Sequence, residues 1–75
     1  MSEDILSNII RVFRARSNIS QQYLAEQIGV TRKTINTIET GRFVPSTILA
    51  LKIARYFDTT VEEIFKLELE VKDEN

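Results

Sequence analysis

The sequence predicts an all-α fold, a bundle of five short helices. Three observations predict it: apolar residues recur at helical spacing in several separate segments, a Ser or Thr stands before most of these segments, and a glycine follows two of them. The 75 residues are enough for one domain with one small core.

The first helix is expected from about Ile5 to Ala15. Asp4 and Ser7 are the two candidates for its N-cap. Arginines gather toward its C-terminal end, where cations suit the helix dipole. The apolar stripe that predicts this helix consists of Ile5, Leu6, Ile9, Ile10, Val12 and Phe13.

The second and third helices are short and lie on either side of a glycine. Ser20 is expected to cap the second helix, which ends before Gly29, and Thr31 is expected to cap the third, which ends at Gly41. The residues expected to point inward are Tyr23, Leu24 and Ile28 in the second helix and Ile35 and Ile38 in the third.

Two more helices follow the loop that contains Pro45. Ser46 is expected to cap the fourth, at about Thr47–Phe57, and Thr60 the last, at Val61–Phe65. Thr60 and Glu63 stand three residues apart, as in a capping box. The expected buried set of the fourth helix is Leu49, Ala50, Ile53, Ala54 and Phe57.

The C-terminal segment has the alternation of a strand, because Leu67, Leu69 and Val71 alternate with charged residues. An otherwise helical chain offers no second strand, so we expect this one to pair with a second copy of itself across a two-fold axis. The alternatives are a disordered tail or a chance alternation in a solvated one. This interpretation divides the chain into a domain, residues 5–65, and a tail, residues 66–75. The expected dimerisation residues are Ile64, Phe65, Leu67, Leu69 and Val71.

The second and third helices also have the spacing of a helix-turn-helix, which inserts its second helix into the major groove of DNA. Ala25 stands where the two helices cross, and Gly29 permits the tight turn between them. The apolar seam that sets the angle between the helices consists of Leu24, Ile28, Val30, Ile35 and Ile38. All these features together at this spacing make a specific signal.

A helical wheel of the third helix indicates which side faces DNA. Opposite the inward Ile35 and Ile38 lies a polar face, and the helix N-terminus usually enters the groove first. Arg can bind guanine, Asn can bind adenine, and a Thr methyl can meet a thymine methyl. The alternative is an ordinary solvated helix face. The predicted base-reading residues are Arg32, Lys33, Asn36 and Thr37.

Amides, hydroxyls and one arginine around the two helices predict phosphate contacts. The two glutamines that open the second helix combine side-chain amides with a helix N-terminus, which suits an anion. The predicted phosphate-binding residues are Gln21, Gln22, Thr31, Thr34, Thr40, Arg42 and Ser46.

Charge is segregated along the chain, although the net charge is only −1. Residues 5–57 contain eight Lys and Arg against two acidic residues, whereas residues 58–75 contain seven acidic residues against two Lys. The basic part includes the proposed groove reader, which favours a nucleic-acid partner. The alternative is that these charges only solvate the surface.

The composition argues against several other classes of protein. The chain has no Cys and no His, so we expect no disulfide, no metal and no other cofactor. It has no glycine-rich phosphate loop, and Glu62 and Glu63 are adjacent and would not share one site, so we expect no enzyme activity. The acidic N-terminus and the lack of a long apolar run predict no signal peptide and no membrane span, and hence a cytoplasmic protein.

The run from Ile19 to Ser46, with Gln-Gln-Tyr-Leu-Ala-Glu-Gln-Ile-Gly-Val followed by Thr-Arg-Lys-Thr-Ile-Asn-Thr-Ile-Glu, resembles the helix-turn-helix domains of the Cro and phage-repressor family. Leu49–Ala54 and Val61–Phe65 resemble its last two helices, so the resemblance covers about residues 8–65. It implies a five-helix bundle that binds operator DNA as a dimer. The chain is also similar to small stand-alone repressors of the cytolysin-repressor type, in which the last helix and a C-terminal strand form the dimer.

The resemblance further implies a salt bridge between Arg14 and Glu39. The chain departs from the family where Arg32 and Lys33 replace the amides often found at the start of the recognition helix, so a base preference cannot be copied from a relative. Apolar residues also stand where the family more often has polar ones, at Ile9, Val12 and Ile48.

Together these observations predict a sequence-specific DNA-binding transcriptional regulator. Its simplest form is a dimeric repressor that binds a two-fold symmetric operator on double-stranded DNA. The alternative is an antitoxin or other partner-binding module, in which the acidic tail binds a basic protein and DNA binding is autoregulatory.

Overall fold

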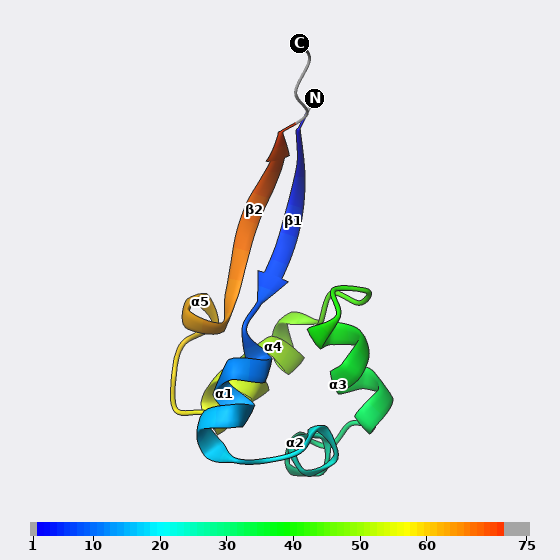
Figure 1. The fold of residues 1–75 in the computed structure, drawn as a ribbon, viewed down its shortest axis with the longest axis vertical. Helices are drawn as coiled ribbons and strands as arrows, with labels where there is room; N and C mark the ends of the chain where they lie inside the picture. Colours follow the sequence, from blue (N-terminus) through cyan, green and yellow to red (C-terminus); the bar gives the residue numbers. More distant parts are fainter. Residues whose placement is uncertain (1, 72–75) are drawn as a thin grey trace.

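The computed structural model describes the backbone of residues 2–71 and the side chains of residues 5–68. Five helices pack around one core, and two strands form a ribbon that extends away from the bundle (Figure 1). Among the helices of residues 2–71, none is long and apolar enough to span a membrane. The elements are β1 Ser2–Asn8, α1 Ile10–Ser17, α2 Gln21–Ile28, α3 Arg32–Glu39, α4 Thr47–Tyr56, α5 Val61–Ile64 and β2 Phe65–Val71.

The five-helix bundle and the C-terminal strand predicted from the sequence are both confirmed. Four of the helices begin at the predicted hydroxyl caps, each of which accepts a hydrogen bond from the backbone N–H three residues ahead. Gly29 has φ 80°, the left-handed conformation that ends α2 and allows the turn into α3. The confirmed caps are Ser20, Thr31, Ser46 and Thr60.

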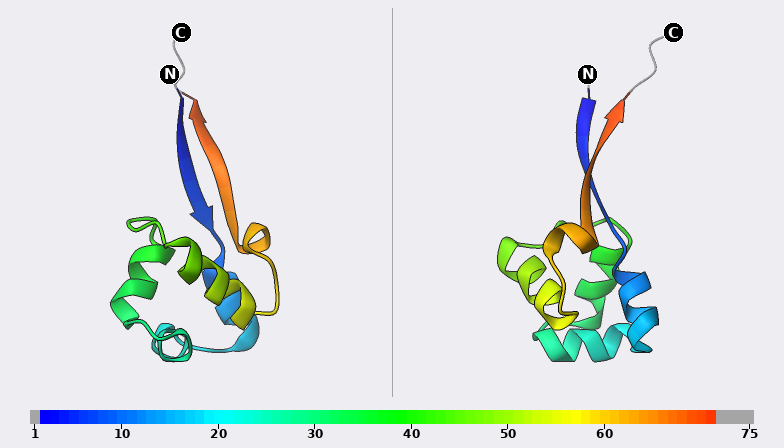
Figure 2. Two further views of the ribbon diagram at one scale, coloured as in Figure 1. Left: turned by 180° about the vertical axis from the view of Figure 1, so that it is seen from behind. Right: turned by 90° about the vertical axis from the view of Figure 1, so that its left-hand side faces the viewer.

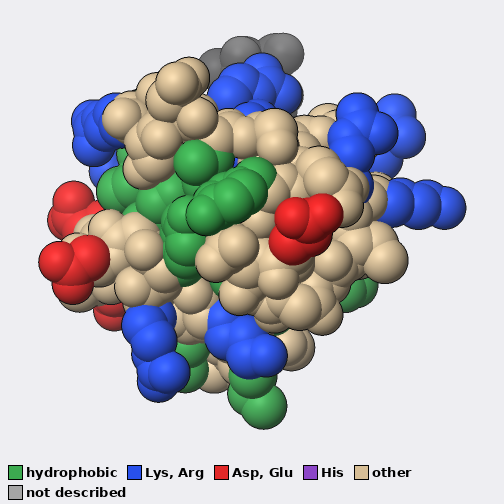
Figure 3. Space-filling view, turned by 90° about the horizontal axis from the view of Figure 1, so that it is seen from below, with side chains coloured by type: hydrophobic (Ala, Val, Ile, Leu, Met, Phe, Trp, Pro, Cys, Tyr) green, Lys and Arg blue, Asp and Glu red, His purple; other side chains and the backbone are tan. Residues whose placement is uncertain are grey.

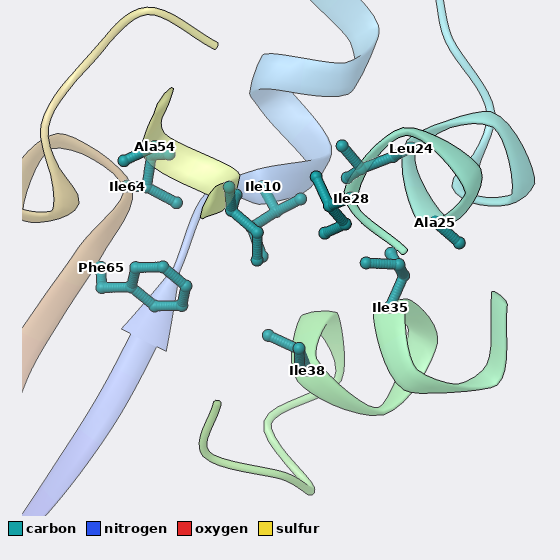
Figure 4. Close-up of a cluster of buried hydrophobic side chains, with 10 residues drawn as sticks. Ile10, Leu24, Ala25, Ile28, Ile35, Ile38, Ala54, Ile64 and Phe65 are labelled. Atoms are coloured by element: carbon teal, nitrogen blue, oxygen red, sulfur yellow. The ribbon is translucent and has the colours of Figure 1, made fainter. Parts of the chain in front are cut away.

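The core draws at least one side chain from every helix and one from the start of β2. Figure 4 shows the side chains of α2 and α3 facing each other around Ile28 and Ile35, with Ile10 of α1 on the other side of Ile28. Ala25 is fully buried, as expected for a residue at the helix crossing. The core residues are Ile10, Leu24, Ala25, Ile28, Ile35, Ile38, Ile53, Ala54, Ile64 and Phe65.

The predicted start of the first helix was wrong. We expected a helix from Ile5, but α1 starts at Ile10, because residues 2–8 form β1. The helix start is held by Asn8, whose Oδ1 accepts a hydrogen bond from the N–H of Ile10 at 3.1 Å and whose Nδ2 donates to the carbonyl of Ile38 at 2.9 Å. Neither expected cap, Asp4 or Ser7, lies next to the observed helix start.

The predicted partner of the C-terminal strand was also wrong. β2 pairs antiparallel with β1 of the same chain, so the pairing that we expected from a second copy is made within one molecule. Figure 2 shows the two strands side by side from two directions, twisting around each other. The register places Leu6 opposite Leu67 and Asn8 opposite Phe65.

The division of the chain into residues 5–65 and 66–75 remains a prediction. β2 begins at Phe65 and pairs with β1, so backbone hydrogen bonds join the two proposed parts. Residues 72–75 of the acidic tail lie outside the described residues.

Several apolar side chains that the helical pattern placed inward are exposed. Ile5 is 44% exposed, Ile9 43%, Val12 41% and Tyr23 46%. The stripe expected on one face of the first helix is therefore divided between β1 and the outer side of α1, and only Ile10 of α1 is fully buried.

Candidate nucleic-acid interface

The outer face of α3 carries the polar side chains expected from the helical wheel. Ile35 and Ile38 are buried against the rest of the bundle, whereas Arg32, Lys33 and Asn36 are exposed. Figure 1 shows α3 at one side of the bundle, beside α2 and away from α1 and α5. This arrangement leaves one long side of α3 open to a large partner.

Two threonines, one in α3 and one at its C-cap, turn their hydroxyls back onto the helix. Thr37 is half-buried and its Oγ1 donates to the carbonyl of Thr34 at 2.9 Å. Thr40 is exposed and its Oγ1 donates to the carbonyl of Asn36 at 2.9 Å. Thr37 therefore presents less surface than the other three predicted base-reading residues.

The expected phosphate contacts include two hydroxyls that already serve as helix caps. Thr31 and Ser46 each accept a backbone hydrogen bond through Oγ, which leaves the hydroxyl hydrogen able to donate to a phosphate oxygen. Thr34 is half-buried, and its Oγ1 lies 3.0 Å from that of Thr31. Arg42 is exposed in the loop after α3.

The two glutamines that open α2 differ in their contacts. Gln22 is exposed, and its Nε2 donates to Glu26 Oε2 at 2.9 Å. Gln21 is half-buried, and its Nε2 donates both to Asn36 Oδ1 at 3.2 Å and to Glu39 Oε1 at 3.1 Å. These contacts of Gln21 were not predicted from the sequence.

The ion pair that the family resemblance implied is present. Arg14 donates through Nε to Glu39 Oε2 at 2.6 Å and through its terminal nitrogen Nη2 to Oε1 at 3.0 Å. The Glu39 side chain is 1% exposed and that of Arg14 15%. The hydrogen bond to Glu39 raises the pKa of Arg14 above the usual arginine value, against the lowering effect of partial burial. The pair ties α1 to the C-terminal end of α3.

An apolar residue beside the polar face was also missed. A hollow next to α3 is lined by Lys33, Thr34, Thr37, Arg42 and Phe43. Phe43 is 48% exposed in the loop that follows α3. The sequence signal that could have predicted this position is an aromatic residue, Phe43, in a short loop directly after the predicted recognition helix.

The acidic side chains on the surface gather mostly away from α3. Figure 3 shows Lys and Arg side chains around this whole face, including a group at the right, on the side of α3, whereas most of the Asp and Glu side chains lie at the left, on the side of α5. The first turn of α5 contains Glu62 and Glu63. A polyanion therefore meets less repulsion on the α3 side of the molecule.

A helix-turn-helix with a buried crossing residue and an exposed polar second helix defines a DNA-binding domain. A family model described as helix-turn-helix matches residues 10–64. The chain belongs to this family, the Cro and phage-repressor type that its sequence resembles.

Relatives from two different organisms are described as HTH-type transcriptional regulators. An uncharacterised HTH-type transcriptional regulator of Bacillus subtilis, YgzD, is 46% identical over 65 residues, which cover 87% of this chain and 98% of that protein. An uncharacterised HTH-type transcriptional regulator of Methanocaldococcus jannaschii is 43% identical over 63 residues, covering 84% and 96%. The chain is therefore a member of a family of DNA-binding transcriptional regulators.

Solved structures show the same fold. The restriction-modification controller protein C.AhdI of Aeromonas hydrophila matches with a TM-score of 0.67 and 30% identity, covering 72% of this chain and 78% of that one. A putative DNA-binding protein of Bacteroides fragilis matches with a TM-score of 0.74 and 24% identity, covering 83% and 100%, and supports the fold alone.

Proposed function

We propose that the protein is a dimeric repressor that binds a two-fold symmetric operator and inserts α3 into the major groove of each half-site. The observation that carries this proposal is the exposed polar face of α3, whose buried side is fixed by the core and by the Arg14–Glu39 pair. A helix fixed on one side and polar on the other can enter a groove without unfolding any part of the bundle.

The proposed base contacts follow from the chemistry of the exposed groups. Arg32 stands at the N-terminal end of α3 and can bind guanine N7 and O6 with two hydrogen bonds, so we expect a guanine in each half-site. Lys33 and Asn36 follow on the same face, and Thr37 contributes a smaller surface. Gln21 is left out of the proposed phosphate contacts, because its amide already binds Asn36 and Glu39. The proposed phosphate contacts are Gln22, Thr31, Thr34, Thr40, Arg42 and Ser46.

The proposed dimer is supported by an exposed apolar residue on the ribbon. Leu67 of β2 is 68% exposed. The side chains of the other two strand residues expected in the dimer contact, Leu69 and Val71, lie outside the described residues. A two-stranded ribbon is only marginally stable in water by itself, so a second copy that covers Leu67 would stabilise it.

The same surface continues onto the bundle. Leu6 and Phe65 share the ribbon face of Leu67 and also line an apolar hollow with Pro45 and Leu51 of the α4 region. Leu51 is 54% exposed. Ile64 and Phe65, which we expected in a dimer contact, are only 1% and 6% exposed and belong to the core of the single chain. The proposed interface therefore moves outward, to Leu67 and Leu51.

A charged substitution of Leu67 tests this interface. Leu67→Asp is expected to weaken dimerisation by at least about 100-fold, because a symmetric dimer loses two buried leucines, each worth about 1.5 kcal/mol or more. Analytical ultracentrifugation over a concentration series measures the dimer dissociation constant. The matched control is Val12→Asp in α1, an exposed apolar residue that is not among those lining this surface. Equal dimerisation by both variants would contradict the interface.

Selection from a random double-stranded DNA pool tests the proposed function itself. At about 150 mM salt, where purely ionic binding is weak, we expect enrichment of a two-fold symmetric motif whose half-sites lie about 10 base pairs apart. This spacing follows from two recognition helices separated by about one turn of DNA. Enrichment of no sequence would contradict sequence-specific binding, and an asymmetric single site would contradict the dimeric operator.

The similar structure of C.AhdI is named as a controller protein, which supports a regulatory role for a domain of this type. The alternative of an acidic tail that binds a protein partner remains a prediction, because residues 72–75 lie outside the described residues.

A further inference from the structure

A chain of polar contacts connects the buried ion pair to the exposed face of α3. Arg14 binds Glu39, and the amide of Gln21 lies between Glu39 and Asn36, with its Nε2 3.1 Å from Glu39 Oε1 and 3.2 Å from Asn36 Oδ1. Arg14 belongs to α1, Gln21 to α2, and the other two residues to α3. The buried end of this chain is charged, and the exposed end is a predicted base reader.

The charge of Glu39 determines which way both amides point. A carboxylate that binds a guanidinium through two hydrogen bonds can only accept, so Gln21 must direct its NH₂ group toward it. The second hydrogen of that NH₂ group points at Asn36, which must then present Oδ1 to Gln21. The NH₂ group of Asn36 is left on the other side of its amide. Without such partners the two orientations of an amide differ little in energy.

The same geometry argues against the expected phosphate contact of Gln21. Both hydrogens of Nε2 are directed at acceptors within the protein. The other polar atom of the amide, Oε1, is an acceptor and repels a phosphate oxygen. Gln22 differs in this respect, because its Nε2 binds only the exposed Glu26 and can exchange that contact for a phosphate.

We propose that Gln21 is a positioning residue that holds Asn36 with its NH₂ group toward the major groove, so that Asn36 reads its base as a hydrogen-bond donor. This inference rests on the proposed function. A donor fits purine N7, guanine O6 and thymine O4, and it opposes cytosine, whose N4 group is also a donor. The second lone pair of Oδ1 still accepts a hydrogen bond from adenine N6.

Base preference at a single position tests this role. Asn36→Ala first identifies the base pair that Asn36 reads, as the position in the selected operator where discrimination is lost. Gln21→Met keeps the length of the side chain and removes its amide, and we expect it to lower discrimination against cytosine at that base pair about tenfold. Combining the two substitutions should lower discrimination there no further than Asn36→Ala alone. Fluorescence anisotropy with the operator and its single-base-pair variants measures these ratios.

Two further variants separate positioning from other roles. Gln27→Met removes another exposed amide of the same helix that has no proposed contact with DNA, and we expect its discrimination at the Asn36 base pair to equal that of the unaltered protein. Gln21→Ala provides a second loss of the amide if the methionine packs poorly against α3. Circular dichroism melts show that each variant is folded before DNA is added.

The outcomes distinguish this inference from the proposed function. If the unaltered protein selects no operator, the proposed function fails. If an operator is selected and Asn36→Ala changes one base pair but Gln21→Met does not, only this inference fails. An equal loss of affinity of Gln21→Met on all sequences, with a smaller salt dependence, would make Gln21 a phosphate contact. Lost discrimination at every base pair would make it a general support of α3, and either result overturns the proposal.

Discussion

Glu39→Ala is expected to lower the free energy of unfolding by about 3 kcal/mol, because it leaves the partly buried Arg14 guanidinium without its carboxylate partner. Small domains have total stabilities of about 5–15 kcal/mol, so this one substitution removes a large part of the total. The melting temperature should fall by at least about 12 °C, since 1 kcal/mol corresponds to about 4–8 °C in a domain of this size. Urea and thermal unfolding followed by circular dichroism measure both quantities.

The matched control is Glu26→Ala, because Glu26 is an exposed carboxylate of α2 that binds only the neighbouring Gln22 among its described contacts. Its expected effect is within about 0.5 kcal/mol. A double variant, Arg14→Met with Glu39→Met, should recover much of the loss, because apolar residues of similar size often replace a buried ion pair without penalty. A melting temperature of Glu39→Ala equal to that of the unaltered protein would contradict the proposed importance of the pair.

The features predicted correctly from the sequence depend on neighbours within about four residues. Ser20, Thr31, Ser46 and Thr60 cap their helices by binding a backbone N–H three residues ahead, and Gly29 adopts a conformation that costs glycine little. The choice between helix and loop at such positions is made locally. A single sequence therefore contains enough information to place them.

The N-terminal strand could not be predicted in this way. Ile5, Leu6 and Ile9 have helical spacing, yet residues 2–8 are extended because their backbone groups pair with β2, about 60 residues further along the chain. The local sequence of neither strand determines which segment of the chain it pairs with. The alternation of Leu67, Leu69 and Val71 predicted that β2 is a strand, but only the folded bundle brings its partner beside it.

In the candidate site, too, local features could be predicted from the sequence and contacts between helices could not. The helical wheel of α3 correctly predicted that Arg32, Lys33 and Asn36 are exposed, because Ile35 and Ile38 define the buried side within one helix. The contact between Gln21 and Asn36 depends instead on how α2 crosses α3, and a crossing angle is set by packing of the whole core. Sequence spacing alone therefore predicted the exposed polar face of α3 and missed the residue proposed to orient Asn36.

Arg32→Ala is expected to weaken binding of the dimer to its selected operator by at least about 30-fold. Each half-site loses one bidentate contact worth about 1–3 kcal/mol, and the two half-sites together lose about 2–6 kcal/mol. The substitution should leave the melting temperature nearly unchanged, because Arg32 is exposed in the first turn of α3 and Thr31 still caps that helix. Fluorescence anisotropy with the operator, its single-base-pair variants and unrelated DNA measures the loss.

The pattern of that loss across sequences identifies what Arg32 contacts. If Arg32 reads a guanine, Arg32→Ala relaxes the preference at one base pair in each half-site and changes binding to unrelated DNA much less. Arg32→Lys is the matched control, since it keeps the positive charge and loses the planar fork that binds N7 and O6 together. Lysine should therefore restore the salt dependence of binding and only part of the base preference. An equal loss on all sequences, fully restored by lysine, would instead place Arg32 on a phosphate and leave the reading of that half-site to Lys33 and Asn36.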